Sequence, residues 1–470
     1  MEIRNFGRNV TFRPGAYFEP ESEAEVLRIL EENCERKFRT IGRLHAWSEA
    51  ARSDEVALNL KHLNHIEVVE EDGQAWVRVG AGCQIKDVIT HLDKRGLALP
   101  SQGLITEQTV AGAVSTGTHG SGKQCLSHFV EEVTVAVFDQ DTGKPVVKTI
   151  SDGLELTVAQ CSLGCVGVIL SLKLSCIPQY NIEEHFRFLK GLDDVFEAEE
   201  EFPLQQFFFL PHSWAYMAQH RRVTDKPKSR LASIYQVYWY VTVDVGLHAV
   251  LLFLTRVLKK SGPVRFFYKR MVPLTIVRNW RVVDKSQLIL TMEHELFRHV
   301  EIEVFVVRSK LGKLLSFVRS IIEYSDGNRE AFDSEMWSQL SQLGLSDSLE
   351  SLRGSYTHHY PICIRKVLPD ECPISMANGS TEPYYAVSFI TYQVTKDRRP
   401  FFEFAKCLAR VASEYFGARP HWGKVCPIEA QAVAKLYPRL AEFRKVCETL
   451  DSKGAFRNRW VEETLFGADG

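Results

Sequence analysis

The sequence predicts an α+β protein built from more than one domain. Its 470 residues are too many for a single hydrophobic core. Short strand and helix patterns alternate through residue 178, whereas longer helices and wider strands follow over 179–417. We therefore expect one domain over 1–178 and a second over 179–417, with a mainly antiparallel sheet covered by helices. A C-terminal segment over 418–470 completes the chain.

The composition is that of an ordinary globular protein and excludes several functional classes. Apolar residues make up 45% of the chain and charged residues 25%. The 57 Lys and Arg residues against 59 Asp and Glu provide no field that would attract nucleic acid. Eleven cysteines are dispersed without a Cys-x-x-Cys pair, which favours reduced thiols over disulfides or a metal site. The first residues lack a signal-peptide pattern, so we expect a cytoplasmic protein.

Several elements of the first domain have clear local signals. A helix is expected to start at Ser22, because Glu25 completes a capping box and apolar residues follow at helical spacing. Strands are expected where β-branched and apolar residues alternate, at 38–41, 56–60, 66–69, 75–79, 130–138 and within 163–174.

A glycine pair after one of these strands resembles part of a dinucleotide-binding fingerprint. Gly80-x-Gly82 follows the strand 75–79, but Ile85 occupies the third glycine position. No acidic residue ends a second strand at the expected distance. We therefore reject a Rossmann domain.

The second domain contains a strand–helix pair with a distinct pattern. Residues 300–307 alternate polar and apolar side chains, as in a half-buried strand, and 310–324 are expected to form a helix packed on it. Another strand is predicted over 384–393. A helix over 401–416 should end at Gly417.

Three motifs carry the chemistry. His45 follows the strand 38–41 and Gly42, which permits a sharp turn and close approach of main chain to a phosphate. The Gly- and hydroxyl-rich loop 109–122 supplies the backbone N–H groups that a pyrophosphate requires. The third motif is His421-Trp422-Gly423-Lys424. Taken singly, each has a plain alternative: a turn histidine, a flexible loop and a solvated lysine.

In this order, the three motifs resemble the sugar-1,4-lactone oxidase (L-gulonolactone and D-arabinono-1,4-lactone oxidase) and alditol oxidase branch of the vanillyl-alcohol oxidase superfamily. The resemblance implies a two-subdomain FAD-binding domain of the PCMH type, a substrate or cap domain, and FAD as cofactor. It also implies covalent attachment of the flavin through His45, although Ala46 replaces the usual serine and Ser48 stands two residues further on. The implied FAD contacts are Gly42, Arg43, Leu44, His45, Ala46, Ser48, Thr109, Gly112, Ser115, Thr116, Gly117, His119, Gly120, Ser121, Gly167, Val168, Ile169 and His421.

The resemblance also implies the catalytic residues. Lys424 would stabilise the negative charge of reduced flavin or of the substrate oxygen. The family's Glu-x-Arg strand corresponds to Cys363-Ile364-Arg365, so the arginine is kept and Cys363 occupies the glutamate position. A thiol cannot bridge two hydroxyls and is a poor base unless its pKa is lowered. Either the alignment shifts locally or the substrate is not a simple aldonolactone or alditol.

One apolar stretch raises the question of a membrane. Residues 235–257 are interrupted by Gln236, Asp244, His248 and Arg256, and the longest clean run is too short to span a bilayer. We expect a buried pair of helices. Peripheral attachment through 235–270 stays open because basic residues follow at once.

The leading functional hypothesis is an FAD-dependent oxidase that transfers hydride from an alcohol carbon of a sugar lactone or polyol to flavin N5, with dioxygen or another acceptor reoxidising the flavin. The alternative, favoured by Cys363, is a specialised flavoenzyme of the same fold with a non-carbohydrate substrate. A third hypothesis is a flavin-bearing scaffold without turnover. Retention of Arg365 and Lys424 argues against it.

Overall fold

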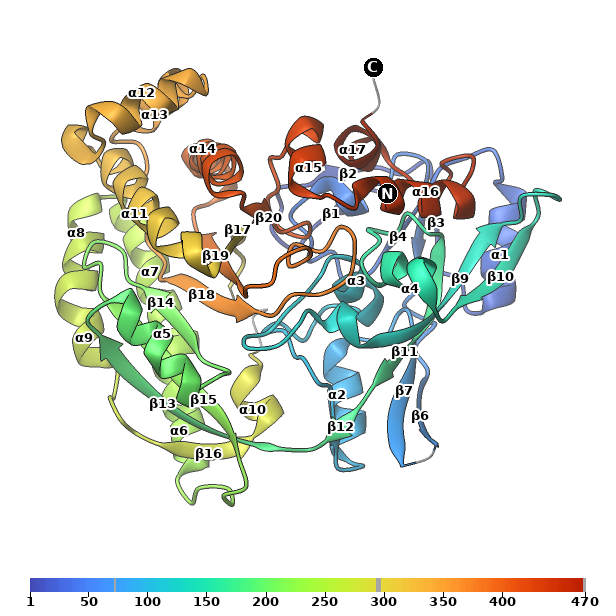
Figure 1. Ribbon diagram of the computed structural model, residues 1–470, viewed down its shortest axis with the longest axis horizontal. Helices are drawn as coiled ribbons and strands as arrows, with labels where there is room; N and C mark the ends of the chain where they lie inside the picture. The colour runs from blue at the N-terminus through green and yellow to red at the C-terminus, as the bar shows by residue number, and fades with distance from the viewer. Residues whose placement is uncertain (72, 293–296, 468–470) are drawn as a thin grey trace.

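The computed structural model describes residues 1–71, 73–292 and 297–467. Figure 1 shows an N-terminal domain on the right and a helix-covered sheet, the cap domain, on the left. The α+β class predicted from the sequence is confirmed by the arrangement of sheets.

The first subdomain is a three-stranded parallel sheet in the order β3-β5-β4. Its strands are β3 (Ala16–Phe18), β4 (Phe38–Ile41) and β5 (Val56–Asn59). Helix α1 (Glu23–Glu32) buries Val26, Ile29 and Leu30, and the Ser22 side chain caps its N-terminus by accepting from the Glu25 amide, as predicted. A small hairpin of β1 (Ile3–Arg4) and β2 (Thr11–Phe12) precedes it. Strand β4 ends just before Gly42, and the turn that carries His45 follows directly.

The second subdomain is a five-stranded antiparallel sheet in the order β10-β9-β11-β7-β6. Strand β7, which leads into Gly80-x-Gly82, pairs antiparallel with both neighbours, so this glycine pair is not part of a doubly wound parallel sheet. The elements are β6 (Ile66–Glu71), β7 (Gln74–Gly80), α2 (Ile85–Asp93), α3 (Val110–Ser115), β9 (Val130–Phe138), β10 (Pro145–Ile150), α4 (Gly153–Gln160) and β11 (Val168–Ser175). Short strands β8 (Leu97–Ala98) and β12 (Ile177–Pro178) pair with each other.

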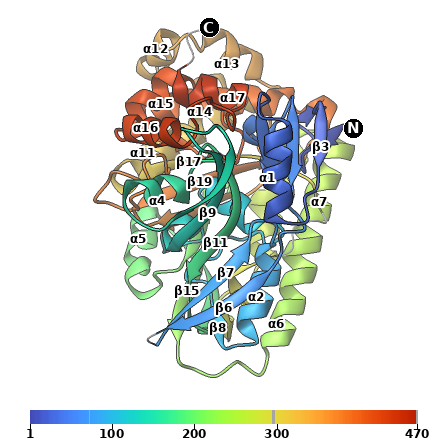
Figure 2. The same cartoon turned by 90° about the vertical axis from the view of Figure 1, so that its right-hand side faces the viewer.

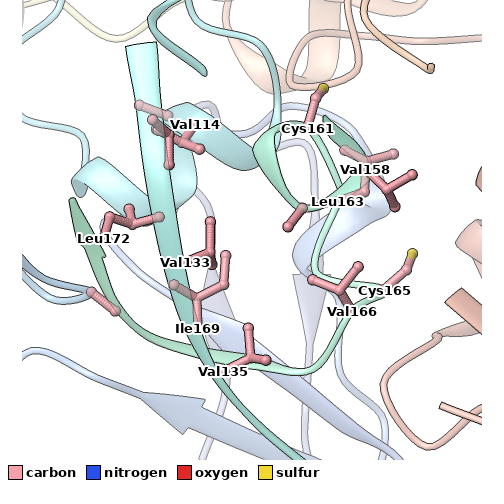
Figure 3. Close-up of a cluster of buried hydrophobic side chains, with 14 of the residues drawn as sticks. Val114, Val133, Val135, Val158, Cys161, Leu163, Cys165, Val166, Ile169 and Leu172 are labelled. Carbon is pink, nitrogen blue, oxygen red and sulfur yellow. The ribbon is translucent and has the colours of Figure 1, made fainter. Parts of the chain in front are cut away.

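Aliphatic side chains fill the space between this sheet and helices α3 and α4. Figure 3 shows Val133 and Val135 of β9 beside Ile169 of β11, with Val114 and Val158 contributed by the helices. Ile169 belongs to this core and also lines the functional cavity. Packing of this core therefore fixes part of the cavity wall.

The cap domain contains an eight-stranded antiparallel sheet in the order β16-β13-β15-β14-β18-β19-β17-β20. Its strands are β13 (Asn181–Leu189), β14 (Gln206–Phe209), β15 (Tyr216–Thr224), β16 (Val282–Lys285), β17 (Val300–Val307), β18 (Ile362–Val367), β19 (Tyr384–Thr391) and β20 (Arg419–Pro420). Helix α5 (Leu192–Glu201) lies against β13 and β15.

One face of this sheet is covered by two long helices, α11 (Arg308–Ser325) and α14 (Arg399–Phe416). Val300, Ile302 and Val304 of β17 pack against them. The predicted alternation of β17 is present, but Glu301 and Glu303 on its other face are buried as well. The expectation of a half-buried strand was thus wrong, because its polar face meets a cavity and not solvent. Helix α14 ends at Gly417 in a left-handed conformation, as predicted.

Further helices are α10 (Ser286–Leu290), α12 (Ser334–Gln342), α13 (Ser346–Leu352), α15 (Ala430–Leu436), α16 (Leu440–Leu450) and α17 (Arg459–Val461). Trp422, Tyr437 and Phe443 join the hydrophobic core of the N-terminal domain. The C-terminal segment thus crosses from the cap sheet, through β20, back to the first domain (Figure 2).

The apolar stretch forms a continuous helix, Ala232–Leu258, which comprises α6 (Ala232–Trp239), π-helical η3 (Tyr240–Leu247), α7 (His248–Phe253) and π-helical η4 (Leu254–Leu258). A second helix returns through α8 (Ser261–Phe266), η5 (Phe267–Met271) and α9 (Val272–Thr275). By length and composition the first helix could cross a membrane, yet only 17% of its most apolar window is buried. The expectation of a buried pair was wrong, since much of its apolar surface is exposed.

Candidate active site

A cavity of about 270 Å³ lies between the N-terminal domain and the cap sheet. Residues from all three sequence motifs line it, together with residues from the cap domain. The predicted residues that it brings together are Gly42, Arg43, Leu44, His45, Ala46, Thr109, Gly112, Ser115, Thr116, His119, Ile169, Cys363, Arg365, His421 and Lys424.

The turn that carries His45 is held in a specific backbone conformation. Leu44 adopts a φ of 56°, and its carbonyl accepts a 2.8 Å hydrogen bond from the Phe6 amide. The His45 ring stacks on Phe6 with a centroid separation of 4.8 Å. Trp47, two residues after His45, donates its amide to the Gly423 carbonyl at 2.9 Å. The His45 turn and the Lys424 loop are therefore fixed relative to each other.

Glycines keep one wall of the cavity free of side chains. A Cβ on Gly42 would lie 2.3 Å from the Thr109 Oγ1, and one on Gly82 would lie 2.1 Å from the Leu60 carbonyl oxygen. Only glycine fits either position, so backbone lies bare along this wall beside Ser115 and Thr116. Such a wall of backbone and short hydroxyls suits a pyrophosphate and a ribityl chain. The fit supports FAD.

Gly82 is a cavity residue that the sequence analysis did not name. Its pair with Gly80 was rejected as a dinucleotide-binding fingerprint, and the structure places Ala81 and Gly82 in the cavity lining. The rejection of a Rossmann fold was right, because β7 pairs antiparallel with both neighbours.

Six predicted FAD contacts lie outside the cavity lining. Ser48 Oγ donates to the Trp422 carbonyl at 2.6 Å, and Ser121 Oγ donates to the Gln205 carbonyl. Gly117 and Gly167 adopt φ values of 74° and 120°. A Cβ on Gly120 would lie 2.4 Å from the Gln102 carbonyl oxygen, and Val168 is buried in the core. These residues shape the loops that position the lining.

The opposite wall is the inner face of the cap sheet. Cys363 of β18 is in register with Phe208 of β14 on one side and with Ser388 of β19 on the other. Ser388 is in register with Glu303 of β17. Directly paired residues in antiparallel strands point to the same side of a sheet. These side chains therefore form one row across the wall.

Neighbouring rows extend this wall in both directions. Arg365 follows Cys363 by two residues and pairs with Gln206, whose Oε1 accepts from the Arg365 Nε at 3.2 Å. On the other side, Ile390 pairs with Glu301.

Glu301 and Lys424 form the closest charged pair in the cavity. The Lys424 Nζ lies 2.5 Å from the Glu301 Oε2, and Ser388 Oγ donates to the other carboxylate oxygen. Lys424 also lies 4.5 Å from the centroid of the Trp47 ring, a cation–π distance. Glu301 is 6% exposed, so both charges are largely removed from water.

Glu303 belongs to a separate cluster with His119 and His421. The His119 Nε2 lies 3.4 Å from the Glu303 Oε2, and the ring centroids of the two histidines are 5.9 Å apart. Burial alone would raise the pKa of Glu303, but His119 and then Lys424 hold this pKa well below its usual range. Burial lowers the pKa of His421 to about 3. We infer that Glu303 stays ionised and that His421 stays neutral.

The structure places Cys363 and Arg365 side by side in the cavity wall. Burial raises the pKa of the Cys363 thiol, and the opposing charge of Arg365 does not reverse this shift. A protonated thiol is neither a base nor a nucleophile. Cys363 therefore contributes shape and apolar surface.

Beyond these polar groups the cavity becomes apolar. The cap domain contributes side chains from the sheet, from both helices of the apolar pair and from neighbouring loops: Phe208, Leu210, Met217, Trp239, Val243, Leu247, Val272, Ile276, Met292 and Tyr360. Sequence reasoning missed this part, because its residues are spread over more than 150 positions.

Sequence reasoning also missed the two glutamates. The available signal was the alternation in Val300-Glu301-Ile302-Glu303, which places both carboxylates on one face. That face was assumed to meet solvent, and only the position of β17 inside the sheet shows otherwise.

Comparisons with known proteins agree with this site. The family described as D-arabinono-1,4-lactone oxidase matches residues 172–464, and a FAD binding domain matches residues 14–142. A long-chain alcohol oxidase from an uncultured marine euryarchaeote is 46% identical over 99% of this chain and 97% of its own length. The L-gulonolactone oxidase of Bos taurus is 24% identical over 99% and 98%.

Cholesterol oxidase from B. sterolicum has a similar fold. The two structures superpose with a TM-score of 0.76 at 14% identity, covering 99% of this chain and 96% of the other. The chain thus has a FAD-binding domain and acts as a FAD-linked oxidoreductase on CH–OH groups. It belongs to the D-arabinono-1,4-lactone oxidase family of FAD-binding oxidases, as the sequence motifs indicated.

Proposed function

We propose that the protein oxidises long-chain aliphatic alcohols to aldehydes, with dioxygen as the final electron acceptor. The observation that carries this proposal is the apolar part of the cavity. It lies between the polar side chains of the cap sheet and the helix pair. A sugar lactone or alditol carries several hydroxyls, each of which needs a partner when it is buried. An alkyl chain needs none.

Cys363 supports the same substrate class. In the lactone and alditol oxidases that the sequence resembles, a glutamate at this position binds substrate hydroxyls, whereas this chain has a protonated thiol. The similarity to a protein named long-chain alcohol oxidase points in the same direction. The hypothesis of a specialised flavoenzyme with a non-carbohydrate substrate is thus better supported than that of a sugar-lactone oxidase.

We assign the general base to Glu301. Glu301 and Glu303 are the two carboxylates among the described residues that line the cavity. Glu303 is held ionised by His119 and is a weak base. Glu301 lies beside Ile390, at the start of the apolar half, where the hydroxyl end of an alkyl alcohol would stop. Its carboxylate would accept the hydroxyl proton.

The neighbouring cations would stabilise the charge that develops at the alcohol oxygen. Lys424 contacts Glu301 and can donate a hydrogen bond to the alcohol oxygen while the hydroxyl proton passes to Glu301. Arg365 is oriented by Gln206 and adds a second positive charge to the same wall. When bound, the flavin supplies the hydride acceptor. The buried wall excludes water from the reacting carbon.

The flavin is proposed to be covalently attached through His45. Support comes from the strained turn at Leu44, from the stacking of His45 on Phe6 and from the position of this ring in the cavity lining. These contacts would hold one imidazole at a fixed edge of the cofactor.

A peroxide assay over a panel of substrates tests the proposed function. We expect kcat/KM to rise with chain length from butanol to dodecanol, since each added methylene buries further apolar surface. Gulonolactone, arabinonolactone and xylitol should produce peroxide far more slowly. Higher activity with any of these three than with dodecanol would contradict the proposal and restore the carbohydrate hypothesis.

A further inference from the structure

The outer side of the apolar helix pair is an exposed hydrophobic surface. The two helices, 232–258 and 261–275, run antiparallel along the left edge of the cap domain in Figure 1. The Tyr238 hydroxyl donates to the Thr275 carbonyl at 2.9 Å and ties the two together. We call the following exposed side chains the outer apolar face: Leu231, Ile234, Val237, Tyr240, Val241, Val250, Phe253, Val257, Leu258, Phe266, Met271, Leu274 and Val277.

Two polar residues of the first helix lie away from this face, whereas Arg256 is exposed near the C-terminal end of the helix. His248 is 1% exposed, and the Gln236 amide donates to Asp284 at 2.6 Å on the inner side. Ile234, Val237, Val241, Val245, Ala249, Phe253 and Val257 follow one another at helical spacing. Val237 is 63% and Leu274 is 85% exposed. A continuous apolar stripe of this kind on a soluble surface marks a binding surface.

The segment that carries the outer apolar face has a strong excess of positive charge. Residues 226–281 hold eleven of the 57 basic residues of the chain but only one of its 59 acidic residues, Asp244. Lys226, Lys228, Lys259, Arg265 and Arg281 pair with acidic side chains outside this segment. Within the described part of the chain, no ion pair involves Arg230, Lys260, Lys269 or Arg270. A strongly basic, apolar surface complements an anionic lipid bilayer.

The positions of these cations fit a pair of helices lying in the plane of a membrane. Arg230 stands at the start of the first helix, and Arg278 follows the end of the second. Lys259 and Lys260 form the turn at the opposite end. Cations at both ends can reach lipid headgroups while the stripe between them enters the acyl region.

The same two helices form a wall of the substrate cavity. Trp239, Val243 and Leu247 line the cavity from the first helix, and Val272 and Thr275 line it from the second. Val243 and Leu247 lie in the π-helical stretch Tyr240–Leu247. The pair therefore separates the cavity from the outer apolar face by the thickness of one layer of helices.

We propose that the outer apolar face inserts into the surface of an anionic bilayer and that the alcohol enters the cavity between the two helices directly from the lipid. The entry route rests on the proposed function, because only a lipid-soluble substrate would use it. Attachment to the bilayer does not depend on it.

Vesicle flotation tests the attachment. The purified flavin-loaded protein should float with vesicles containing phosphatidylglycerol and bind less to vesicles of phosphatidylcholine alone. The variant Val237→Glu/Phe253→Glu/Leu274→Glu should stay at the bottom of the gradient, since none of these side chains lines the cavity. A matched control, Val146→Glu/Val147→Glu, alters exposed valines of β10 in the N-terminal domain and should float like the wild type.

Two results would overturn the attachment. One is wild-type protein that remains at the bottom with both vesicle types. The other is a triple variant that floats as well as the wild type. If the wild type fails to float but is a dimer by light scattering, and the triple variant is a monomer, the surface is a protein–protein interface instead.

Activity measurements separate this inference from the proposed function. The triple variant should lose at least tenfold in rate on dodecanol presented in anionic vesicles, while its rate on water-soluble hexanol stays unchanged. An equal loss on both alcohols would contradict entry from the lipid. Flotation of a wild-type protein that oxidises neither alcohol would leave the membrane surface standing and remove the proposed substrate.

Discussion

At the scale of single residues, the site separates two carboxylates that are two positions apart on one strand. Glu301 contacts Lys424 and Ser388, whereas Glu303 contacts His119. In the proposed mechanism these different partners would give the two groups different roles, as base and as fixed charge. The cap sheet would then supply the base from β17, whereas the resembled family has its glutamate on the strand that here carries Cys363.

Removal of this base should slow the chemical step. Glu301→Gln preserves shape but cannot accept the hydroxyl proton, so flavin reduction by dodecanol should slow by about 10²- to 10⁴-fold. Rapid-mixing measurements of flavin bleaching report this step directly. Glu303→Gln is the matched control on the same strand and should have a much smaller effect. Equal losses in both variants would contradict the assignment of the base to Glu301.

Lys424 should matter for charge and not for cofactor retention. Lys424→Ala should lower the rate of flavin reduction by about 10²- to 10³-fold, the usual cost of losing one group that stabilises developing charge. Lys424→Arg keeps the charge and should recover part of the rate. The flavin-to-protein absorbance ratio should stay near the wild-type value in both variants. An unchanged reduction rate in Lys424→Ala would remove Lys424 from the mechanism.

We expect His45 to hold the flavin through a covalent bond. After acid precipitation the wild-type pellet should remain yellow, while the His45→Ala protein should release free FAD into the supernatant. Complete release from the wild type would disprove covalent attachment through His45. The FAD-binding domain itself would be unaffected by that result, because it rests on independent matches to the chain.

Cys363 should determine which substrate fits. Cys363→Ser nearly preserves volume and should keep most activity on dodecanol. Cys363→Glu introduces a carboxylate beside Arg365, so it should weaken alcohol oxidation and increase activity on alditols and aldonolactones. Loss of flavin reduction in Cys363→Ser, with normal FAD content, would show that the thiol takes a direct chemical part.

At the scale of elements, the sequence predicted the alternation of polar and apolar side chains along β17. It did not predict what each face of the strand packs against. Val300, Ile302 and Val304 pack under α11 and α14, while Glu301 and Glu303 face the cavity. A period of two identifies two faces and does not say which of them meets water. The same limit explains the apolar helix, where Gln236 and His248 were taken as interruptions although both lie on the inner face.

Asp244 gives the helix pair a measurable pH dependence. Burial raises the pKa of Asp244 to about 7, and its Oδ1 has no hydrogen-bond partner among the described residues. His248 lies on the same helix, and burial lowers its pKa, so it stays neutral around pH 7; Tyr360 also faces Asp244. The unfolded chain loses the Asp244 proton near pH 4, whereas the folded protein keeps it up to about pH 7. The contribution of Asp244 to stability therefore falls as pH rises through this window.

Replacement by asparagine should remove this dependence. Asp244→Asn should raise the melting temperature relative to the wild type more at about pH 8 than at about pH 5. Thermal unfolding of both proteins across this range gives the difference curve. A difference that does not change with pH would show that Asp244 is ionised throughout.

At the scale of the whole molecule, the sequence predicted the class of fold and the three motifs that meet at the cavity, because each motif is local. The His45 turn, the loop 109–122 and the segment 421–424 are each recognisable within a few residues. The substrate side was not predictable in this way. Its wall combines five neighbouring strands of the cap sheet with the two helices of the apolar pair, and their order in space is not their order in the chain.

The two walls of the cavity come from different domains, and the local motifs describe only one of them. The wall formed by the three local motifs faces a cap wall that has polar groups on β17, β18 and β19 and apolar side chains toward the helix pair. In the proposed function, the polar groups would act on the hydroxyl, and the apolar part of the cap would select the rest of the substrate. This selection of an alkyl chain is the central point to test.

Anaerobic reduction of the bound flavin is the most direct test, because it does not depend on the electron acceptor. Mixed with dodecanol in the absence of oxygen, the protein should lose its visible flavin absorbance in a single turnover, at a rate that saturates with alcohol concentration. Gulonolactone at the same concentration should leave the absorbance essentially unchanged over that time. Rapid loss of flavin absorbance with gulonolactone, and none with dodecanol, would contradict long-chain alcohol oxidation and would support a sugar lactone as the substrate.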